Sequence, residues 1–403
     1  MKSLSDYRVH VPEPKISKIY QKATDIAGSH IINVNATYYG GGVAEMMRSV
    51  VPLMNDIGIN AGWRSIVGSH DFFQVTKKFH NALQGDDKIN LSEMKKKAYE
   101  TTNVEFARFT HVDHDLVVVH DPQPLPLIQF YDKHQPWVWR CHIDLSDPNP
   151  EIWDYLRSFV LKYDRLIYQM EEFAAEGMKN TRMIHPAIDP LTTKNKNLAD
   201  EDLRKKLEDA GIDPDRPFIA QISRYDKWKD PTGVIEIYKR LKELDADCQL
   251  AMVGGMASDD PEGQEVFREV KKAAEGLEDV NLIVDAPDIL VNAVQTGADV
   301  VLQMSKREGF GLTATEAMWK RSPVVATDVG GLKLQVQDGN TGYIVEPEDY
   351  DSAARKVAKL LDNENKRRKM GQRARERVRN NFLITRLIED WVNVYRDLLL
   401  NNH

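Results

Sequence analysis

The chain has 403 residues, enough for two or three domains that each have a core of their own. Its formal net charge of −8 argues against non-specific nucleic-acid binding, because proteins of that class carry a basic face. Its two cysteines, Cys141 and Cys248, lack the spacing of a zinc or redox motif, so we expect no disulfide framework and a reducing, cytoplasmic compartment. We expect no transmembrane helix and no signal peptide, because no apolar stretch approaches about 18 residues and the first residues are polar.

The first half of the chain alternates short apolar segments with amphipathic ones, which predicts strands followed by helices. Strands are predicted at residues 31–35, 61–67, 116–119, 137–142 and 165–169, and helices at 43–54, within 69–112 and at 151–162. The segment 183–190 is extended and is interrupted by prolines. The Lys/Asn-rich segment 191–200 is interpreted as a linker.

A second strand–helix series follows. Its strands are predicted at residues 218–222, 249–253, 280–284, 300–303, 324–326 and 343–345, and its helices near 231–244, 261–275, 289–297, 312–321 and 350–362, with a helical end from 364. Two such series predict an α/β fold with two Rossmann-like parallel-sheet domains facing across a cleft. The expected limits are 1–195 and 196–375 for the two domains and 376–403 for a C-terminal helix that packs back on the first domain.

The turn between the strand at 300–303 and the following helix is the strongest sign of a ligand site. It carries Glu308, Gly309, Phe310, Gly311, Leu312, Thr313 and Glu316. The glycines let the backbone pass close to a ligand, and the N–H groups at a helix N-terminus suit a phosphate or diphosphate. The carboxylates suit sugar hydroxyls, so the turn points to a ligand with both parts, such as a nucleotide sugar. Glu316 is equally well explained as the last residue of a capping box that begins at Thr313.

A second signal is the segment 223–230, at the carboxyl end of the first strand of the second series. Arg224 offers a two-pronged donor and Lys229 a point charge, with Ser223 beside them. Two cations at a strand end can neutralise a diphosphate leaving group as its bond breaks. The alternative is a solvated turn in which nearby aspartates pair with the cations.

Other glycines and one amide follow further strands. The triplet at 40–42 resembles a phosphate loop, so Gly41 and Gly42 are candidates for approaching a diphosphate, but a flexible turn would explain them too. Gly254, Gly255 and Asn292 suit the wall of a nucleobase pocket.

Polar residues also follow two strands of the first domain. They are His120 and Asp121 after one strand, and Arg140, His142 and Asp144 at the end of the next. These groups could hydrogen-bond sugar hydroxyls or assist proton transfer, whereas a lone histidine is more often structural. No metal-ligand set stands out, and the sequence contains no H-E-x-x-H motif.

Taken together, these motifs resemble the signature of the retaining nucleotide-sugar glycosyltransferases of the GT-B fold (glycosyltransferase family 4). The resemblance spans residues 217–346 and is carried by Arg224, Lys229, the run 308–312, and Glu316. It implies that Glu308 contacts the donor sugar and that the N–H groups of 309–313 hold sugar hydroxyls and the diphosphate. It also implies that Glu316 takes the ribose diol, and that Arg224 and Lys229 bind the diphosphate.

In the first domain, residues 120–124, 139–144 and 186–191 are similar to trehalose glycosyltransferring synthases and to the related retaining trehalose phosphorylases. The likeness implies that this domain binds the acceptor and that His142 lies against the donor glucose, near its 6-hydroxyl. One departure lies at 320–323, where the family usually has a glycine before the proline.

The resemblance implies a retaining glucosyltransferase that joins glucose from UDP-glucose or ADP-glucose to glucose, forming trehalose reversibly. Its expected catalytic residues are Arg224, Lys229, Glu308 and His142. A front-face substitution is preferred, because no carboxylate of the first domain stands out as a nucleophile. The alternatives are a trehalose phosphorylase, a glycosyltransferase with another lipid or sugar acceptor, and a non-enzymatic sugar-binding protein.

No tightly bound cofactor is expected, and any stimulation by Mg²⁺ would occur without a protein metal site. The expected partners are small-molecule sugars and nucleotides, with no nucleic acid and no stable membrane association. A homodimer is the default expectation for a chain of this kind.

Overall fold

The computed structural model describes residues 2–38, 41–255 and 261–400. Contacts between Cα atoms divide the chain into unit 1, residues 1–186 with 384–403, and unit 2, residues 187–383. The division falls after residues 186 and 383, whereas the expected limits lie after residues 195 and 375. Each unit is a parallel α/β sheet with helices, so the predicted fold class is confirmed.

Unit 1 is built on a six-stranded parallel sheet with the strand order β2-β1-β3-β4-β5-β6. The strands are β1 His30–Asn35, β2 Asn60–Ser65, β3 Leu116–His120, β4 Trp137–Arg140, β5 Arg165–Tyr168 and β6 Thr181–Met183. All five residues of β3 are buried, as expected of a parallel strand covered on both faces. The strand order reverses between β1 and β3, and ligands of such sheets bind at the carboxyl ends of strands beside a reversal.

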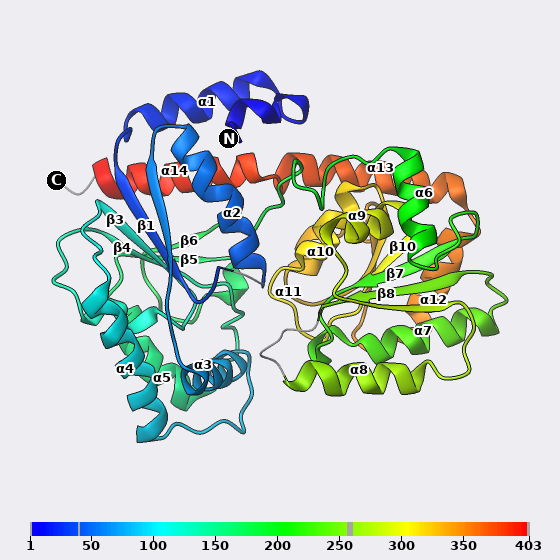
Figure 1. Cartoon of the computed structure of the whole chain (residues 1–403), viewed down its shortest axis with the longest axis horizontal. Helices are drawn as coiled ribbons and strands as arrows, with labels where there is room; N and C mark the ends of the chain where they lie inside the picture. Colours follow the sequence, from blue (N-terminus) through cyan, green and yellow to red (C-terminus); the bar gives the residue numbers. More distant parts are fainter. Residues whose placement is uncertain (1, 39–40, 256–260, 401–403) are drawn as a thin grey trace. The chain divides into compact units, whose positions relative to one another are not determined.

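The helices of unit 1 are α1 Glu13–Thr24, α2 Gly41–Asp56, α3 His70–Leu83, α4 Glu93–Phe109, α5 Pro150–Val160 and α14 Ile384–Leu400, with short 3₁₀ helices η1 Leu4–Val9, η2 Leu125–Gln129 and η3 Glu171–Phe173. The C-terminal α14, red in Figure 1, contacts the blue helices α1 and α2. It buries an apolar stripe that includes Ile388 and Trp391. An ion pair of 2.7 Å between Lys22 and Glu389 adds a polar contact between α1 and α14.

Unit 2 has a second six-stranded parallel sheet, in the order β12-β11-β10-β7-β8-β9. The strands are β7 Phe218–Ile222, β8 Gln249–Gly254, β9 Val280–Val284, β10 Val300–Gln303, β11 Val324–Thr327 and β12 Gly342–Val345. The helices are α6 Asp200–Asp209, α7 Pro231–Glu243, α8 Pro261–Ala273, α9 Asp288–Gly297, α10 Leu312–Trp319, α11 Gly330–Gln335, α12 Tyr350–Leu361 and α13 Glu364–Asn381, with η4 Lys227–Lys229.

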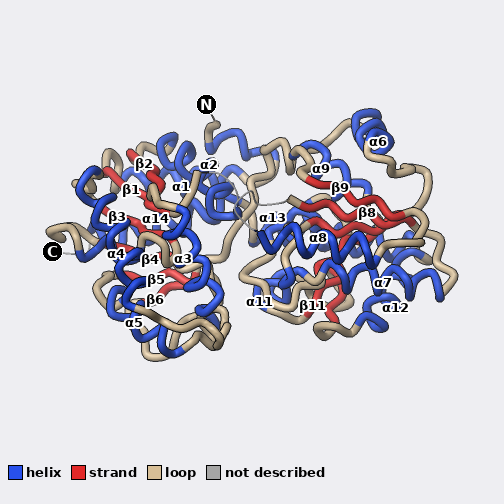
Figure 2. Tube along the Cα trace, turned by 60° about the horizontal axis from the view of Figure 1, so that its bottom comes forward, coloured by secondary structure: helices blue, strands red, loops and turns tan. Residues whose placement is uncertain are grey.

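The order of the second sheet reverses between β7 and β10, which pair directly, with Ala220 opposite Val301. This pairing places the connections that follow these two strands, residues 223–230 and 304–311, at the same edge of the sheet. In unit 2, helices lie on both faces of the strands, as Figure 2 shows with helices in blue and strands in red. The layered arrangement explains why every residue of the core strands β7 and β10 is buried.

The segment 191–200 is not a free linker, so that interpretation is wrong. Asn195 is 2% exposed, and its carbonyl accepts a hydrogen bond of 3.1 Å from the indole N–H of Trp319. Helix α6 begins at the end of this segment, and neither α6 nor α11 is predicted from the sequence. Both are short, and α6 is so polar that its period is hard to see, with Leu207 as its one buried residue.

Within the described residues, no helix has both the length and the apolar character that crossing a membrane requires.

Candidate active site

The turn before α10 presents a row of backbone donors. Gly311 has φ of +85°, and a Cβ added there would lie 2.7 Å from Cδ2 of Leu332, so glycine is the residue that this turn accepts without strain. The N–H groups of residues 309–313 donate to no residue in the described parts of the chain, and the first bond inside the turn runs from Ala314 N to Gly311 O, 3.0 Å. Such a row at a helix N-terminus is a site for a phosphate or diphosphate.

Helix α11 braces this turn from behind. The N–H of Gly331 donates to the carbonyl of Gly309 at 3.2 Å, and a Cβ on Gly331 would lie 2.5 Å from Cα of Phe310. The side chain of Gln335 donates to the carbonyl of Phe310 and accepts from the hydroxyl of Thr315. Helix α11 therefore supplies the hydrogen bonds to the carbonyls of the turn, and the N–H groups of the turn are left for a ligand.

Glu308 and Lys229 form an ion pair, with 2.5 Å between Oε2 of Glu308 and Nζ of Lys229. The same oxygen accepts hydrogen bonds from the hydroxyl of Ser305 at 3.0 Å and from the amide of Gln303 at 3.5 Å. The Glu308 side chain is 8% exposed and that of Lys229 19%. The two residues come from the connections after β10 and β7, so the structure joins the two strongest motifs of the sequence.

Arg224 has a looser environment than Lys229. Its side chain is half exposed, and Nη2 lies 3.4 Å from Oδ2 of Asp226. Asp226 also accepts from the N–H of Trp228 at 2.9 Å, so its carboxylate is shared. The predicted alternative of an aspartate-paired turn therefore holds for Arg224 and not for Lys229. An exposed guanidinium with a weak partner remains suited to a bidentate contact with a diphosphate.

Glu316 does not belong to a capping box, so that interpretation is wrong. The residue before the first turn of α10 is Gly311, which has no side chain to accept a hydrogen bond. Glu316 is 2% exposed and accepts from the amide of Gln295 at 3.1 Å, while Nζ of Lys194 lies 3.7 Å from its other oxygen. Thr313 donates instead to Gln303, at 2.9 Å. Its carboxylate already has protein partners, so the expected contact with a ribose diol stays a prediction.

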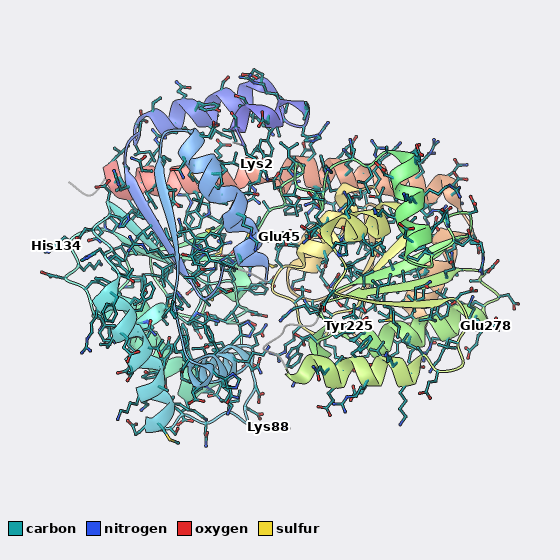
Figure 3. All side chains as sticks on the ribbon, viewed as in Figure 1. Lys2, Glu45, Lys88, His134, Tyr225 and Glu278 are labelled. Atoms are coloured by element: carbon teal, nitrogen blue, oxygen red, sulfur yellow. The ribbon has the colours of Figure 1, made fainter. Side chains whose placement is uncertain are left out.

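Two of the expected nucleobase contacts are glycines near the end of β8. A Cβ on Gly254 would lie 2.4 Å from the ring of Tyr225, so this glycine makes room for the Tyr225 ring, which is labelled in Figure 3. Gly255 is exposed, and among the described residues only Asp285 would lie within 4 Å of a Cβ added to it.

The structure gives Asn292 a different role from the expected one. Its side chain has no exposed surface, and it donates to the carbonyls of Thr193 and Lys196 at 2.9 and 2.8 Å. Its oxygen accepts from the hydroxyl of Thr296 at 3.1 Å. Asn292 therefore fastens the segment around residue 195 to α9, and its side chain has no exposed surface for a donor molecule.

In unit 1, Gly41 and Gly42 are the first two residues of α2, and Gly40 lies outside the described residues. The alternative of a flexible turn therefore does not hold for Gly41 and Gly42. Their N–H groups belong to a helix N-terminus, which is the feature that attracts anions.

The polar residues after β3 and β4 divide into buried and accessible ones. Arg140 is 1% exposed and donates to the carbonyls of Tyr168 and Ile184, and burial lowers its pKa to about 9. His120 is also 1% exposed. Neither side chain has surface to offer an acceptor, so the acceptor contacts expected of Arg140 and His120 stay predictions without support from burial.

His142, Asp121 and Asp144 are only partly buried. The backbone at Asp121 is left-handed, with φ of +64°, and its Oδ1 accepts the N–H of His142 at 2.8 Å. Burial raises the pKa of Asp121 to about 7. Asp144 accepts the N–H of Ser146 at 2.9 Å. These three side chains are the ones that remain available for a sugar at this edge of the unit 1 sheet.

Sequence reasoning missed the residues that hold the predicted ones in place. In unit 2 these are Gln303 and Ser305, which bond Glu308, and Gln295 and Lys194, which lie against Glu316. A polar residue at the end of an otherwise apolar strand, such as Gln303 in Val-Val-Leu-Gln, is a sequence signal that could have identified it as a site residue. Lys194 has no local signal, because only the fold brings it to α10.

The residues described by the structure include no group of three or more His, Cys, Asp or Glu side chains that could hold a metal ion.

Two family models match the chain in tandem. Residues 33–175 match "Trehalose synthase, N-terminal domain", and residues 202–377 match "Glycosyl transferases group 1". The trehalose synthase of Thermococcus litoralis is 45% identical over 399 residues, which cover 98% of this chain and 96% of that protein. The chain belongs to the trehalose synthase family.

This member of the trehalose synthase family is a glycosyltransferase with the GT-B fold. A structural relative is an α,α-trehalose-phosphate synthase from Burkholderia xenovorans, with a TM-score of 0.74 over 92% of this chain and 100% of that one, at 15% identity. A trehalose phosphorylase of Grifola frondosa is 27% identical over 393 residues, which cover 85% of this chain and 54% of that protein.

The departure from the family pattern after α10 is visible in the backbone of this trehalose synthase family member. Arg321 is left-handed, with φ of +69°, a conformation that glycine adopts without strain. A Cβ on Gly371 would lie 1.9 Å from the carbonyl oxygen of Arg321, so α13 packs directly against this turn. The departure affects the C-terminal end of α10 and leaves the donors at its N-terminus unchanged.

Proposed function

We propose that the chain is a retaining glucosyltransferase that transfers glucose from a nucleoside diphosphate glucose, UDP-glucose or ADP-glucose, to glucose, forming α,α-trehalose reversibly. The single observation that carries the donor assignment is the row of N–H groups from 309 to 313 without partners among the described residues. A diphosphate supplies the oxygens that such a row needs. The names of the relatives, trehalose synthase and trehalose phosphorylase, support glucose and trehalose as the sugars.

The cations beside this row suit the departure of a diphosphate. Lys229 and Arg224 lie on the connection after β7, next to the strand that leads into the N–H row. Lys229 pairs with Glu308, so an arriving diphosphate would share the charge of Lys229 and free Glu308 for the hydroxyls of the donor sugar. Glu316, held by Gln295, would take the ribose diol.

For retention we propose a front-face substitution. The bond between C1 of glucose and the diphosphate oxygen breaks, and the acceptor hydroxyl bonds to C1 on the same face. The leaving diphosphate takes the proton of that hydroxyl, so the charges and atoms balance. In support, Asp121, the carboxylate beside the β1/β3 reversal, accepts a backbone N–H and has a pKa raised to about 7 by burial, which does not favour a nucleophile.

The test is a product assay with UDP-glucose or ADP-glucose and ¹³C-labelled glucose, with the linkage read by NMR. Formation of labelled α,α-trehalose and free nucleoside diphosphate supports the proposal. A β-linked product would overturn retention. No product from either donor, with turnover of trehalose and inorganic phosphate, would replace the function by that of a phosphorylase.

The phosphorylase alternative is favoured by the same row of N–H groups, because it would hold inorganic phosphate as readily as a diphosphate. The two functions separate at Glu316, which has a ribose to bind only in the first case. Glu316→Gln would raise the donor KM of a nucleotide-dependent reaction and leave phosphorolysis within a few-fold of the unaltered protein.

We also propose that no tightly bound cofactor takes part, since Arg224, Lys229 and the N–H row supply positive charge for the diphosphate. Any stimulation by Mg²⁺ would then act on the free nucleotide. Activity that persists in excess EDTA supports this, whereas a complete and Mg²⁺-reversible loss of activity would contradict it.

A further inference from the structure

A chain of three hydrogen bonds runs across neighbouring strands of unit 1. The side-chain amide of Asn33 on β1 donates to the carbonyl of Gly62 on β2, at 3.2 Å. The Oδ1 atom of Asn33 lies 3.1 Å from Nε2 of His120, the last residue of β3. The Nδ1 atom of His120 lies 3.1 Å from Nε2 of His142, which follows β4. The chain therefore follows the sheet order β2, β1, β3, β4.

The contact between the two histidines is a hydrogen bond in the plane of the rings. The rings are nearly parallel, at 16°, and their centroids are 5.5 Å apart. Nδ1 of His120 and Nε2 of His142 are 3.1 Å apart. A centroid distance as long as 5.5 Å requires that these two nitrogens lie between the ring centroids, close to the line that joins them. In rings stacked face to face, the nitrogens would lie beside the line between the centroids, so the two histidines are not stacked.

Burial favours the neutral form of both rings. Burial lowers the pKa of His120 to about 3, with Arg140 adding to the effect. Burial, then Arg140 and then His120 lower the pKa of His142 well below its ordinary value. A neutral imidazole carries one N–H and one acceptor nitrogen, so each ring can donate in only one direction.

The direction of the whole chain is set at its first member. A backbone carbonyl only accepts, so the atom of Asn33 that faces Gly62 must be the NH₂ group, and Oδ1 must face His120. Oδ1 also only accepts, so Nε2 of His120 carries the proton and its Nδ1 is an acceptor. The Nε2 atom of His142 must then donate to His120, which leaves Nδ1 of His142 without a proton.

We propose that Asn33 and His120 are positioning residues that hold His142 in its Nε2–H form, so that Nδ1 of His142 accepts a hydrogen bond from a substrate hydroxyl. This Nδ1 atom bonds to no residue within the described parts of unit 1, and the side chain is partly exposed. The backbone of His142 is fixed from both sides, because its N–H donates to Asp121 and its carbonyl accepts from the amide of Gln169. The ring is thus fixed in place and in the position of its proton.

The proton position can be measured without any enzymatic activity. In protein labelled with ¹⁵N, the ring nitrogens of His142 are assigned by their loss in His142→Gln, and their shifts and couplings report which nitrogen carries the proton. We expect the Nε2–H form in the unaltered protein. A proton on Nδ1, or a charged ring at neutral pH, would overturn the proposal.

Asn33→Leu removes the acceptor that faces His120 while keeping a side chain of similar size. The proton of His120 is then expected to move to Nδ1, where it has His142 to bond, and the proton of His142 is expected to move to its own Nδ1. The matched control is Asn35→Leu, since Asn35 is also buried on β1 but bonds Thr37 and Trp63 instead. The proposal requires that His142 change form in the Asn33 variant and not in the control.

The substrate part of the inference rests on the proposed function and has its own test. A fluorine in place of a hydroxyl accepts weakly and cannot donate, so a series of deoxyfluoro donors and acceptors finds the hydroxyl that donates to Nδ1. For the unaltered protein, fluorine at one position should lower kcat/KM about tenfold relative to the unmodified sugar. For Asn33→Leu, the same fluorine should lower kcat/KM much less. Equal losses in both proteins at every position would overturn the substrate contact. Absence of any turnover with the unmodified sugars would count against the proposed function and leave the proton measurement standing.

Discussion

Lys229 and Glu308 lie 79 residues apart in the sequence and form an ion pair of 2.5 Å at the carboxyl edge of the unit 2 sheet. Neither side chain is fully buried, and the carboxylate has Ser305 as a second close donor. The pair connects the segment proposed to hold the leaving group with the segment proposed to hold the sugar. Mutations of Lys229 and Arg224 should therefore have different effects on stability, because Lys229 has a close ionic partner and Arg224 has only a loose one.

Removal of either cation should slow the chemical step. For Arg224→Ala and Lys229→Ala we expect kcat to fall by about 10²–10³, the usual cost of deleting a preorganised donor at a developing charge. The control is Lys227→Ala, because Lys227 is exposed on the same short helix and contacts only the ring of Trp228 in the described structure. A kcat within a few-fold of the unaltered protein in both active-site variants would contradict the leaving-group role. Lys229→Ala should also unfold more easily than Arg224→Ala, since it leaves Glu308 with one ionic partner fewer.

Gly311→Ala should lower the stability of the protein and also weaken donor binding, whereas a control glycine should affect stability alone. The left-handed backbone costs alanine about 1 kcal/mol or more, and the added Cβ would press on Leu332. Gly339→Ala is the matched control, because Gly339 has φ of +70° and open space around it. Both variants should lose stability in denaturant unfolding, and only Gly311→Ala should also raise the KM for the donor. An unchanged donor KM in Gly311→Ala would mean that the N–H row does not bind the donor.

Glu316→Gln should weaken donor binding more than turnover. A hydrogen bond between a hydroxyl and a carboxylate contributes about 1.5–3 kcal/mol, so the donor KM should rise about tenfold or more while kcat changes little. Donors made with 2′-deoxy or 3′-deoxy ribose provide the control, because they lack one of the hydroxyls in question. The unaltered protein should discriminate against them and the variant should not. Equal discrimination by both proteins would remove Glu316 from the ribose site.

Asp121→Asn should change how stability depends on pH. The folded pKa of Asp121, about 7, lies above its ordinary value of 3.8, so the folded state binds the proton more tightly than the unfolded state. Its contribution to the free energy of unfolding is therefore largest below pH 3.8, falls as the pH rises between these two values, and levels off above about 7. The variant lacks this titration but keeps an oxygen for the N–H of His142. Relative to the unaltered protein, the free energy of unfolding of Asp121→Asn should rise between about pH 5 and about pH 8. A difference between the two proteins that does not depend on pH would contradict the raised pKa of Asp121.

Much of the fold follows from local pattern. Most strands of the two sheets can be predicted because each is a short, mainly apolar run, as in Leu116–His120 and Phe218–Ile222. The short strand β6, Thr181–Met183, has no apolar run and is not predicted from the sequence. Local pattern also picks out the turn that is proposed to bind the donor, because its glycines and carboxylates follow a buried strand. It fails at the segment near residue 195, which is as polar as a linker but is fastened by Asn292 and Trp319.

The errors at the site share one cause. Thr313 and Glu316 have the spacing of a capping box, but Gln303 and Gln295 occupy their side chains. Arg140 ends a strand where a ligand would bind, but its guanidinium turns inward to two backbone carbonyls. In each case the competing partner is distant in sequence, and its position depends on strand order that composition and periodicity do not encode.

The return of α14 to unit 1 has a consequence for how the chain is made. Unit 2 is continuous in sequence, whereas unit 1 consists of residues 1–186 and the final helical segment, with α14 packed on α1 and α2. During synthesis, unit 2 has all its strands before unit 1 has its last helix, so unit 1 is the slower to be completed. Until α14 docks, the surfaces that it covers stay open, including the side of His120 that faces the ring of Trp391 at 6.4 Å. Ribosome-bound chains that stop before residue 384 should therefore already contain all of unit 2, while unit 1 still depends on its C-terminal helix.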